Sequence, residues 1–288
     1  MPTPTRQLID CDVHYDPRSM LTDLAPYMPD LWRSYIANRG FGNPPVLPYA
    51  LWQGPERLDV EPGKPEEGRA SMDPSRLRQH LDDWQITTAI ITPGRFLGTA
   101  YLPQREFAAA LAAAHNDMTV ERWLSSDDRL LGSIFVAGQD VAASVREIDR
   151  LAEHPRMVQL VLPTRSPGTG SWADERYEPM WQAAVRNDLV VAFHLVGAAG
   201  DVPPPTTYGW PRSYMELSVT YPIAAQCELS ALVCRGVLSR HPTLKIAMIE
   251  NGFDWVPYLM WQMDKRWREL RAEVPWLTRR PSDYLRDQ

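Results

Sequence analysis

Residues 177–197, YEPMWQAAVRNDLVVAFHLVG, contain the pattern that decides the fold. The first twelve residues are a predicted helix, and the last nine are apolar except for His194 and a final glycine. A strand that is apolar throughout, rather than at alternate positions, is typical of a parallel sheet with helices covering both faces. This helix and strand therefore predict an α/β protein.

The same order of elements recurs along the 288-residue chain. Helical segments separate most of the predicted strands, which cover residues 7–14, 87–93, 129–136, 157–163, 189–197 and 244–252. Repeated units of this kind form either a (β/α)8 TIM barrel or a doubly wound sheet. No strand is followed by GxGxxG or by a GxxxxGK turn, so the marks of common nucleotide-binding sites are missing.

Polar residues at strand ends favour the barrel, because TIM barrels build their active sites at the carboxyl ends of the strands. The residues found there are His14, Arg95, Arg165, His194 and Glu250. We expect a single barrel domain over residues 1–288. Two Pro-rich insertions, at about 17–75 and 198–217, are expected to form lids over its mouth.

Charge and composition exclude several classes of partner. The net charge of −6 argues against nucleic acid or an anionic membrane as the main partner. No run in the sequence approaches the roughly 18 apolar residues that cross a bilayer, and the first residues, MPTPTRQ, lack the apolar core of a secretory signal. Three cysteines without a CxxC pattern suit reduced thiols, so we expect a cytoplasmic protein.

Residues 8–17, LIDCDVHYDP, place acids and a histidine at alternate positions of an apolar segment. At about 3.3 Å per residue, Asp12 and His14 are roughly 6.6 Å apart and their side chains can bind one metal ion, whereas Asp10 and His14 span roughly 13 Å. A solvated loop with a capping aspartate is the alternative. A lone strand-end histidine such as His194 also fits a hydrogen-bonded core imidazole, but two histidines at one barrel end favour a metal site.

Five stretches, taken in chain order, carry a family resemblance: IDCDVH (9–14), HNDMTVERW (115–123), DDRLLGSIFV (127–136), ADERYEPMWQAAVRNDLVVAFH (173–194) and GVLSRHPTLKIAMIENGFDWVPYLMWQMDKRW (236–267). They resemble the amidohydrolase-related family, the branch of the amidohydrolase superfamily that includes aminocarboxymuconate semialdehyde decarboxylase and the resorcylate-type decarboxylases. The resemblance covers nearly the whole chain. It implies a metal-dependent (β/α)8 barrel with a divalent ion, zinc or manganese, at the mouth.

The resemblance also implies roles for single residues. It places the metal ligands on Asp12, His14 and His194. A histidine that activates metal-bound water in the decarboxylases is replaced here by Glu250, which could move a proton or pair with a lid arginine. Arg165, at the end of the fourth predicted strand, is the candidate for holding a substrate carboxylate, although a solvent-facing ion pair explains it equally well.

One departure from the family concerns the end of the chain. Family members continue into a seventh and an eighth strand, and the eighth carries an aspartate that completes the metal site. Residues 281–287, PSDYLRD, align before the seventh strand, so Asp283 is not taken as that ligand. We therefore expect strands 7 and 8 to be missing, either because the sequence is a fragment of a longer protein or because the barrel is left open. Unpaired edges on the first and sixth strands are then expected to cause aggregation or to form a homodimer.

The other histidines have simpler interpretations. His241, in the RHP turn before the sixth strand, is expected to be a turn residue. His80, His115 and His154 fall on predicted helices and are expected to be exposed or at packing edges.

Two classes of function remain. The first is a metal-dependent hydrolase or non-oxidative decarboxylase that acts on a small carboxylated or aromatic molecule, with Glu250 moving the proton. The second is a non-catalytic relative that keeps the fold as a binding or assembly module, which an incomplete ligand set would favour. A dinucleotide oxidoreductase lacks its glycine fingerprint.

Overall fold

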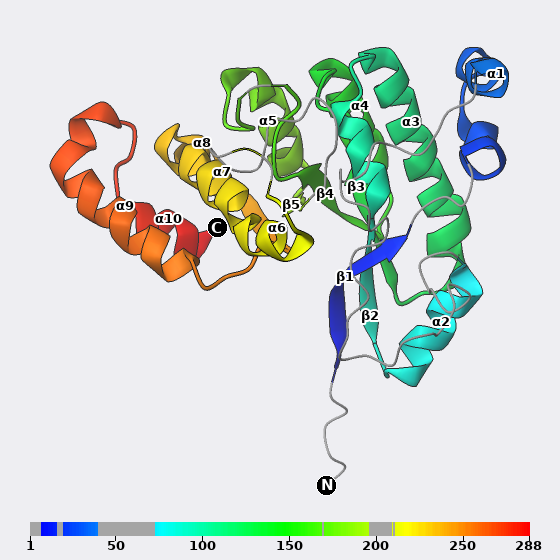
Figure 1. The fold of residues 1–288 in the computed structure, drawn as a ribbon, viewed down its shortest axis with the longest axis horizontal. Helices are drawn as coiled ribbons and strands as arrows, with labels where there is room; N and C mark the ends of the chain where they lie inside the picture. The colour runs from blue at the N-terminus through cyan, green and yellow to red at the C-terminus, as the bar shows by residue number, and fades with distance from the viewer. Residues whose placement is uncertain (1–6, 16–19, 40–72, 169, 196–208, 210) are drawn as a thin grey trace, which may run out of the picture.

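Six parallel strands form one sheet in the computed structural model, which describes residues 7–15, 20–39, 73–168, 170–195, 209 and 211–288 (Figure 1). The strands pair in chain order, each beside the one before it. They are β1 (Ile9–Tyr15), β2 (Thr88–Pro93), β3 (Leu130–Phe135), β4 (Met157–Pro163), β5 (Val190–His194) and β6 (Lys245–Ile249). A doubly wound sheet reverses its strand order partway, whereas a barrel never does. The predicted barrel-type α/β fold is therefore confirmed, with six strands among the described residues.

Helices lie outside the sheet and connect its strands (Figure 1). They are α1 (Asp30–Arg39), α2 (Pro74–Asp83), α3 (Arg105–Met118), α4 (Val141–Ala152), α5 (Glu178–Arg186), α6 (Tyr214–Thr220), α7 (Pro222–Cys234), α8 (Val237–Arg240), α9 (Val256–Leu270) and α10 (Pro281–Asp287). Short 3-10 or π turns cover Met20–Leu24, Ala25–Tyr27, Arg95–Tyr101, Thr119–Trp123, Leu124–Ser126, Glu175–Tyr177 and Arg271–Glu273.

Local chemistry explains where two of these helices begin. The carboxylate of Asp73 accepts a hydrogen bond from the backbone N–H of Ser75 at the start of α2. Asp140 does the same for the N–H of Ala143 in α4. Each such cap satisfies an N–H that has no partner inside the helix and contributes about 1 kcal/mol.

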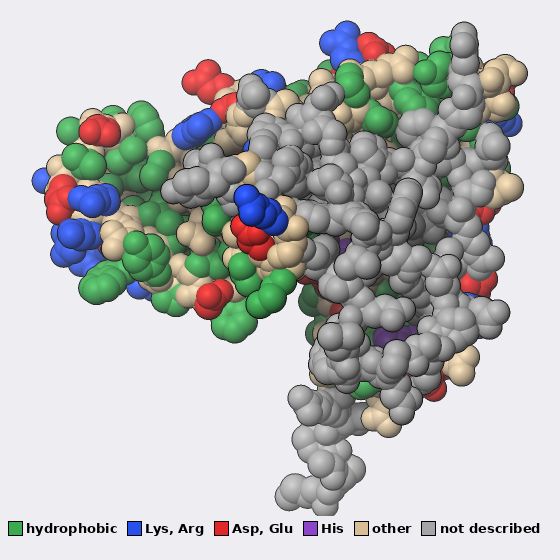
Figure 2. Space-filling model, in the orientation of Figure 1, with side chains coloured by type: hydrophobic (Ala, Val, Ile, Leu, Met, Phe, Trp, Pro, Cys, Tyr) green, Lys and Arg blue, Asp and Glu red, His purple; other side chains and the backbone are tan. Residues whose placement is uncertain are grey.

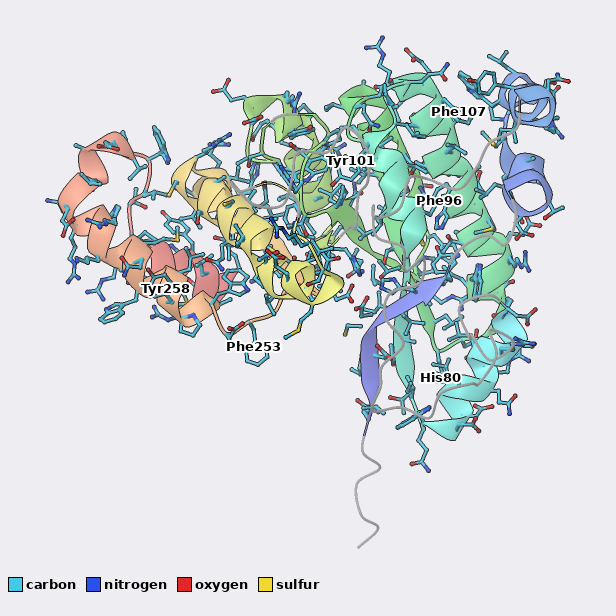
Figure 3. All side chains as sticks on the ribbon, in the orientation of Figure 1. His80, Phe96, Tyr101, Phe107, Phe253 and Tyr258 are labelled. Carbon is cyan, nitrogen blue, oxygen red and sulfur yellow. The ribbon has the colours of Figure 1, made fainter. Side chains whose placement is uncertain are left out.

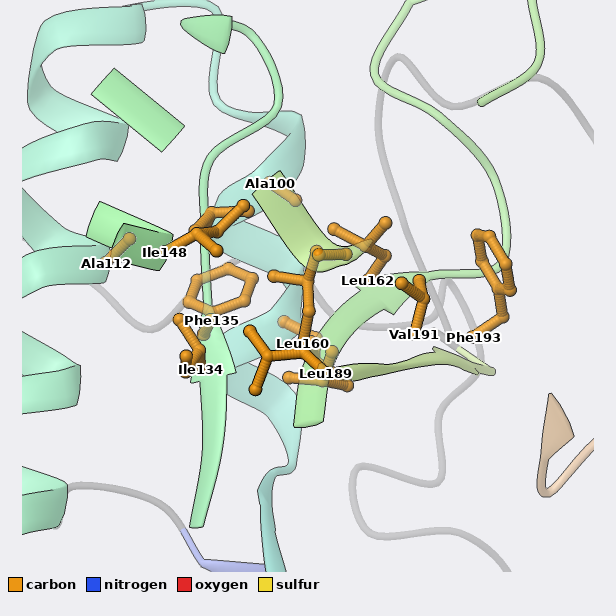
Figure 4. Packing of buried hydrophobic residues seen from close by; sticks show 14 of the residues in the cluster. Ala100, Ala112, Ile134, Phe135, Ile148, Leu160, Leu162, Leu189, Val191 and Phe193 are labelled. Atoms are coloured by element: carbon orange, nitrogen blue, oxygen red, sulfur yellow. The ribbon is translucent and has the colours of Figure 1, made fainter. Parts of the chain in front are cut away.

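The core lies between the sheet and its helices, and β3, β4 and β5 contribute fully buried side chains to it. Ile134, Leu160 and Val191, one from each strand, have no exposed surface and belong to one continuous cluster (Figure 4). Burial of a side chain of this size stabilises the fold by about 1.5–3 kcal/mol. The central strands are mostly apolar because helices or neighbouring side chains cover both of their faces. The buried polar side chains of Ser133 and Gln159 satisfy each other, since Gln159 donates to the Ser133 hydroxyl at 2.7 Å.

The two outer strands differ from the central four, because among the described residues each has one side without a neighbouring strand. A groove of about 590 Å³ runs between them. It is lined by residues 8–12 at β1, by residues 247–250 at β6, and by His80, Trp84 and Ile86. One backbone group on the β6 edge is satisfied by the end of the chain, since the N–H of Ile246 donates to the carbonyl of Gln288.

Most of the two expected lid insertions falls outside the described residues. Of the first, residues 20–39 are described, and α1 packs on α3 with the rings of Trp32 and Phe107 5.1 Å apart. Of the second, residues 209 and 211–217 are described. The role of both as lids, and the single-domain boundary, stay predictions.

One helical run is a candidate membrane span, which we did not expect from the sequence. Within the described part of the chain, Met215–Cys234 is long and apolar enough to cross a membrane, judged by length and composition alone. A core helix passes the same test, and a third of this run's most apolar window is buried (33%). The run is therefore weak evidence for a membrane span.

The expectation for His115 was wrong. Its side chain is fully buried on the inner face of α3 and stacks on Phe96, with ring centroids 4.5 Å apart. Neither ring nitrogen has a hydrogen-bond partner among the described residues. Burial among aromatic rings lowers the pKa of His115 from its ordinary 6.5 to about 3, because the charged form would lose its hydration.

We predict that His115→Phe reduces the sensitivity of the fold to acid. Between pH 6.5 and 3 the unfolded chain binds a proton on His115 that the folded chain does not, so stability falls as the pH falls through this window. The loss is about 1.4 kcal/mol per pH unit for one such group. We expect the free energy of unfolding, measured with urea, to fall less between pH 7 and pH 5 in the variant than in the wild type. An unchanged difference would contradict a neutral buried imidazole.

Candidate metal centre

Four side chains meet at the carboxyl ends of three strands. Asp12 and His14 come from β1, His194 is the last residue of β5, and Glu250 directly follows β6. Each offers one nitrogen or oxygen atom, and these four atoms all lie within 4.8 Å of one another. The structure thus brings together the residues that the sequence selected from three distant segments.

An irregularity in β1 directs Asp12 toward this group. The register with β2 shifts between Asp10 and Val13, which is the signature of a bulge. The Asp10 carboxylate accepts a hydrogen bond from the backbone N–H of Asp12 at 3.1 Å and so stabilises the shifted backbone. Bulges near functional sites commonly re-aim one side chain in this way. Asp10 is therefore a supporting residue and does not belong to the four.

His194 has an orientation suited to binding a metal. Its side chain is 4% exposed, and its Nδ1 donates to the carbonyl oxygen of Leu195. Its Nε2 faces Asp12 Oδ1 at 3.3 Å and Glu250 Oε2 at 3.7 Å. A backbone partner on Nδ1 leaves Nε2 with a free lone pair, as in many metal-binding histidines.

His14 completes the group from the neighbouring position on β1. Its Nε2 lies 3.5 Å from Asp12 Oδ1, and its ring meets that of His194 edge to face with centroids 4.7 Å apart. The Nδ1 atom of His14 is buried and has no hydrogen-bond partner among the described residues. A buried imidazole nitrogen without a partner is costly, so the group is not satisfied by its own side chains.

Charge is stabilised within this group. Burial alone would raise the pKa of Asp12, but the hydrogen bond with His194 and the nearby charges of His194 and His14 outweigh it and lower that pKa. Burial alone would lower the pKa of His194, but Asp12, the Leu195 carbonyl and Glu250 outweigh it and raise that pKa. Both shifts favour the charged forms, a carboxylate at Asp12 and an imidazolium at His194. A metal ion would have to replace the proton on Nε2 of His194, so metal binding at this site should weaken as the pH falls.

Three of the distances within the group are close to those between ligands of one metal ion, and the whole set lies within 4.8 Å. Ligand atoms at about 2.1 Å from one tetrahedral ion lie roughly 3.4 Å from each other. The three contacts to Asp12 and Glu250 measure 3.3, 3.5 and 3.7 Å, at or beyond the 3.2 Å limit of a good N–H···O bond. Imidazole nitrogens with carboxylate oxygens suit zinc and manganese. The residues present therefore fit a divalent ion.

Sequence reasoning missed Asn251, which holds the carboxyl ends of β4, β5 and β6 together. This buried side chain donates to the carbonyls of Phe193 and Ile249 and meets the Thr164 hydroxyl at 3.3 Å. Beside it, Glu250 has a φ of +57°, a conformation that costs a residue with a Cβ of order 1 kcal/mol or more. The only sequence signal was the IENG turn after an apolar strand.

Two other residues from the sequence analysis lie outside the four. Arg165 follows β4 at the same end of the sheet, where its carbonyl accepts a hydrogen bond from the hydroxyl of Tyr101 at 3.0 Å. His241 follows α8, as expected for a turn residue, and its Nε2 pairs with Glu178 at 2.7 Å. Glu250 thus lies at the centre and His241 does not, as the order of elements indicated.

Comparison with known proteins identifies a related enzyme. A gamma-resorcylate decarboxylase from Rhizobium sp. (strain MTP-10005) is 26% identical over 195 residues, which cover 65% of this chain. The match spans 58% of the length of that relative.

Solved structures are similar in fold. An amidohydrolase from Mycobacterium avium subsp. paratuberculosis K-10 superposes with a TM-score of 0.73 at 19% identity, over 99% of this chain and 82% of the other. A dihydroxybenzoic acid decarboxylase from Polaromonas sp. JS666, solved with bound manganese and the inhibitor 2-nitroresorcinol, has a TM-score of 0.63 at 16% identity, over 99% of this chain and 77% of the other. The family model named Amidohydrolase matches residues 9–287. Because that match covers almost the whole chain, the protein belongs to the amidohydrolase family.

Proposed function

We propose that this protein is a metal-dependent, non-oxidative decarboxylase of small carboxylated aromatic acids. The observation that carries the proposal is the convergence of two imidazole nitrogens and two carboxylate oxygens within 4.8 Å at the carboxyl end of the sheet. The likeness to a gamma-resorcylate decarboxylase supports decarboxylation over hydrolysis. Manganese in a relative of the same fold supports a divalent ion, and zinc is the alternative.

Asp12, His14 and His194 would hold the ion. When bound, the ion would supply positive charge that fixes and polarises the oxygens of an aromatic acid. His194 is buried, and the Leu195 carbonyl accepts from its Nδ1, which orients the ring with Nε2 toward Asp12.

Glu250 would carry the proton. Decarboxylation breaks the bond between the ring carbon and the carboxyl carbon, leaves its electron pair on the ring carbon, and releases CO2. That ring carbon must then take one proton. The Glu250 side chain is 56% exposed, so it can collect a proton from water and deliver it inside the site.

The remaining proposals concern partners and location. Arg165, at the same end of the sheet, would hold the substrate carboxylate through its guanidinium. The protein would work in the cytoplasm, without nucleic acid or membrane partners, as a homodimer. Three free and exposed cysteines support a reducing compartment.

Metal analysis tests the centre itself. Purified protein dialysed against manganese or zinc should retain about one equivalent of ion per chain. We expect His194→Ala to weaken binding by roughly 100-fold or more, beyond the 10–100-fold typical of losing only outer support. His154 was expected on a helix but lies in the turn between α4 and β4, because α4 ends at Ala152. His154→Ala, outside the four, is the matched control and should bind normally. Mass spectrometry of bound metal and calorimetric titration provide the readouts, and a metal-free wild type would refute the centre.

The variant Glu250→Gln distinguishes two possible roles of Glu250, as the carrier of the proton or as a metal ligand. We expect this variant to bind the ion within a few-fold of the wild type and to lose about 100-fold or more in kcat on gamma-resorcylate, because the amide cannot donate a carboxylic proton. CO2 release measures the rate, and reaction in D2O should place one deuterium on the ring carbon. If Glu250→Gln instead loses the metal, Glu250 is a ligand and another group moves the proton.

Arg165→Ala should act on substrate binding. Loss of a hydrogen bond to a charged group costs about 1.5–3 kcal/mol, so KM should rise about tenfold or more while kcat changes little. Arg165→Lys should recover only part of the loss, because it lacks the bidentate fork. An unchanged KM in both variants would assign Arg165 to an ion pair on the surface.

A further inference from the structure

Glu228, on α7, is the only buried acidic side chain in the part of the chain that the structure describes. The residue is 5% exposed. Acidic and basic side chains are normally found on the surface, where Figure 2 shows them in red and blue over the outer helices. Removing a carboxyl group from water is costly unless it is hydrogen-bonded, so the partners of Glu228 indicate its role.

Glu228 holds the loop that follows β4. We define the β4 loop as residues 164–168 and 170–174. The hydroxyl of Ser171 donates a hydrogen bond to Glu228 Oε1 at 2.8 Å, and the backbone N–H of Trp172 donates to the same carboxyl group. Because Ser171 Oγ accepts the N–H of Ala173 at 3.0 Å, its own proton is directed to Glu228. One side chain of α7 thus fixes two successive residues of the loop.

Trp172 connects this contact to the end of β4. Its indole Nε1 donates to the carbonyl of Pro163, the last residue of β4, at 2.8 Å. The ring is fully buried and lies against Gly138, where an added Cβ would come within 2.5 Å of it. Close packing of this kind leaves Trp172 little room to shift. At the other end of the loop, the N–H of Thr164 donates to the carbonyl of His194 at 2.8 Å, so the β4 loop is anchored at both ends.

Arg165 lies between these two anchors. Its carbonyl accepts a hydrogen bond from the hydroxyl of Tyr101 at 3.0 Å. The charges of Arg165 and Glu228 both act on that hydroxyl, so both groups lie close to it. Figure 3 shows Tyr101 within the body of the protein, unlike Phe253 and Tyr258 at its rim. Glu228 therefore contacts the loop from inside the protein, near the residue that the proposed function assigns to the substrate carboxylate.

We propose that Glu228 is a positioning residue, which holds the β4 loop closed and thereby sets Arg165 for the carboxylate of the substrate. This inference rests on the proposed function, in which Arg165 binds that carboxylate. A loop that is ordered before the substrate arrives does not have to be ordered on binding, which strengthens binding. The partly exposed ion pair of Arg235, directly after α7, with Asp174 adds only a weak link between the same helix and the same loop.

The charge of Glu228 changes near neutral pH. Burial raises its pKa from the ordinary 4.5 to about 7, although the hydrogen bonds from the β4 loop oppose that rise. The charged and titratable side chains that face it are Arg235, which lowers the pKa, Asp174, which raises it, and the tyrosines Tyr101 and Tyr177. Glu228 is thus mainly neutral below pH 7 and mainly charged above it. A negative charge beside the loop disfavours the binding of an anionic substrate there.

Hydrogen exchange tests the holding role without any measurement of activity. We expect Glu228→Ala to speed amide exchange in residues 170–177 about tenfold or more, because the Trp172 N–H loses its acceptor. Glu228→Gln should restore slow exchange, since its amide oxygen accepts the same bonds. Ser171→Ala is a smaller change that removes one of the two bonds, and it should act in the same direction as Glu228→Ala.

The matched control is Arg235→Ala, which breaks only the partly exposed ion pair between the same two elements. It should speed exchange in residues 170–177 by less than about fivefold. Equal acceleration in Glu228→Ala and Arg235→Ala, or unchanged exchange in Glu228→Ala and Ser171→Ala, would overturn the proposal.

Steady-state kinetics on gamma-resorcylate test whether the loop sets Arg165. We expect Glu228→Ala to raise KM about tenfold while kcat changes little. In the Arg165→Ala background the same substitution should add little, because a residue that acts through Arg165 has no effect once Arg165 is gone. Full addition of the two losses in the double variant would contradict positioning.

The pH dependence of KM gives a readout that mere structural support would not change. In the wild type, KM should rise several-fold from pH 6 to pH 8 as Glu228 becomes charged. Glu228→Gln stays neutral, so its KM should rise less over the same range. Groups of the metal centre titrate in both proteins, and the difference between the two profiles therefore reports on Glu228. Identical profiles would overturn a place for Glu228 beside the substrate carboxylate.

These measurements distinguish the failure of this inference from the failure of the proposed function. A wild type that binds manganese but releases no CO2 from gamma-resorcylate would refute the proposed function, and hydrogen exchange would still decide whether Glu228 holds the loop. An active decarboxylase whose loop exchange and KM are unchanged by Glu228→Ala would overturn the inference alone.

Discussion

The contact between Asp12 and His194 is the constraint on which the rest of the structure depends. The two residues lie on β1 and β5, which are four steps apart in the sheet. In a flat sheet, strands that far apart would be separated by roughly 19 Å. Their side-chain atoms are 3.3 Å apart, so the sheet must curl until its ends face each other. The curl makes the site and orders the helices around it, since each helix must follow the turning sheet.

The apolar strands and the strand-end residues were predictable, because each depends on local sequence. Strands buried on both faces are mostly apolar, as in β4 and β5, and the parallel direction then collects His14, His194 and Glu250 at one end. A polar residue at the end of such a strand is visible without knowing its neighbours. The ligand roles of these residues were drawn from resemblance and stay predictions.

Features that depend on neighbouring elements were not predictable. The bulge at Asp10–Val13 depends on how β1 aligns with β2, and the IDCDVH stretch alone does not predict it. The burial of His115 depends on which side of α3 faces the sheet, and α3 is so rich in alanine that its sequence hardly distinguishes one side from the other. Asn251 is informative only once three strand ends are known to meet beside it.

The left-handed backbone at Glu250 has a consequence for how this protein would respond to selection for heat resistance. Glycine or asparagine adopts a φ of +57° with less strain than glutamate does, so either would gain stability at this position. Each would also remove the carboxylate that faces His194. A library screened only for residual fold after heating should therefore accumulate changes at residue 250, and those survivors would be folded but would lack one of the four side chains of the candidate metal centre.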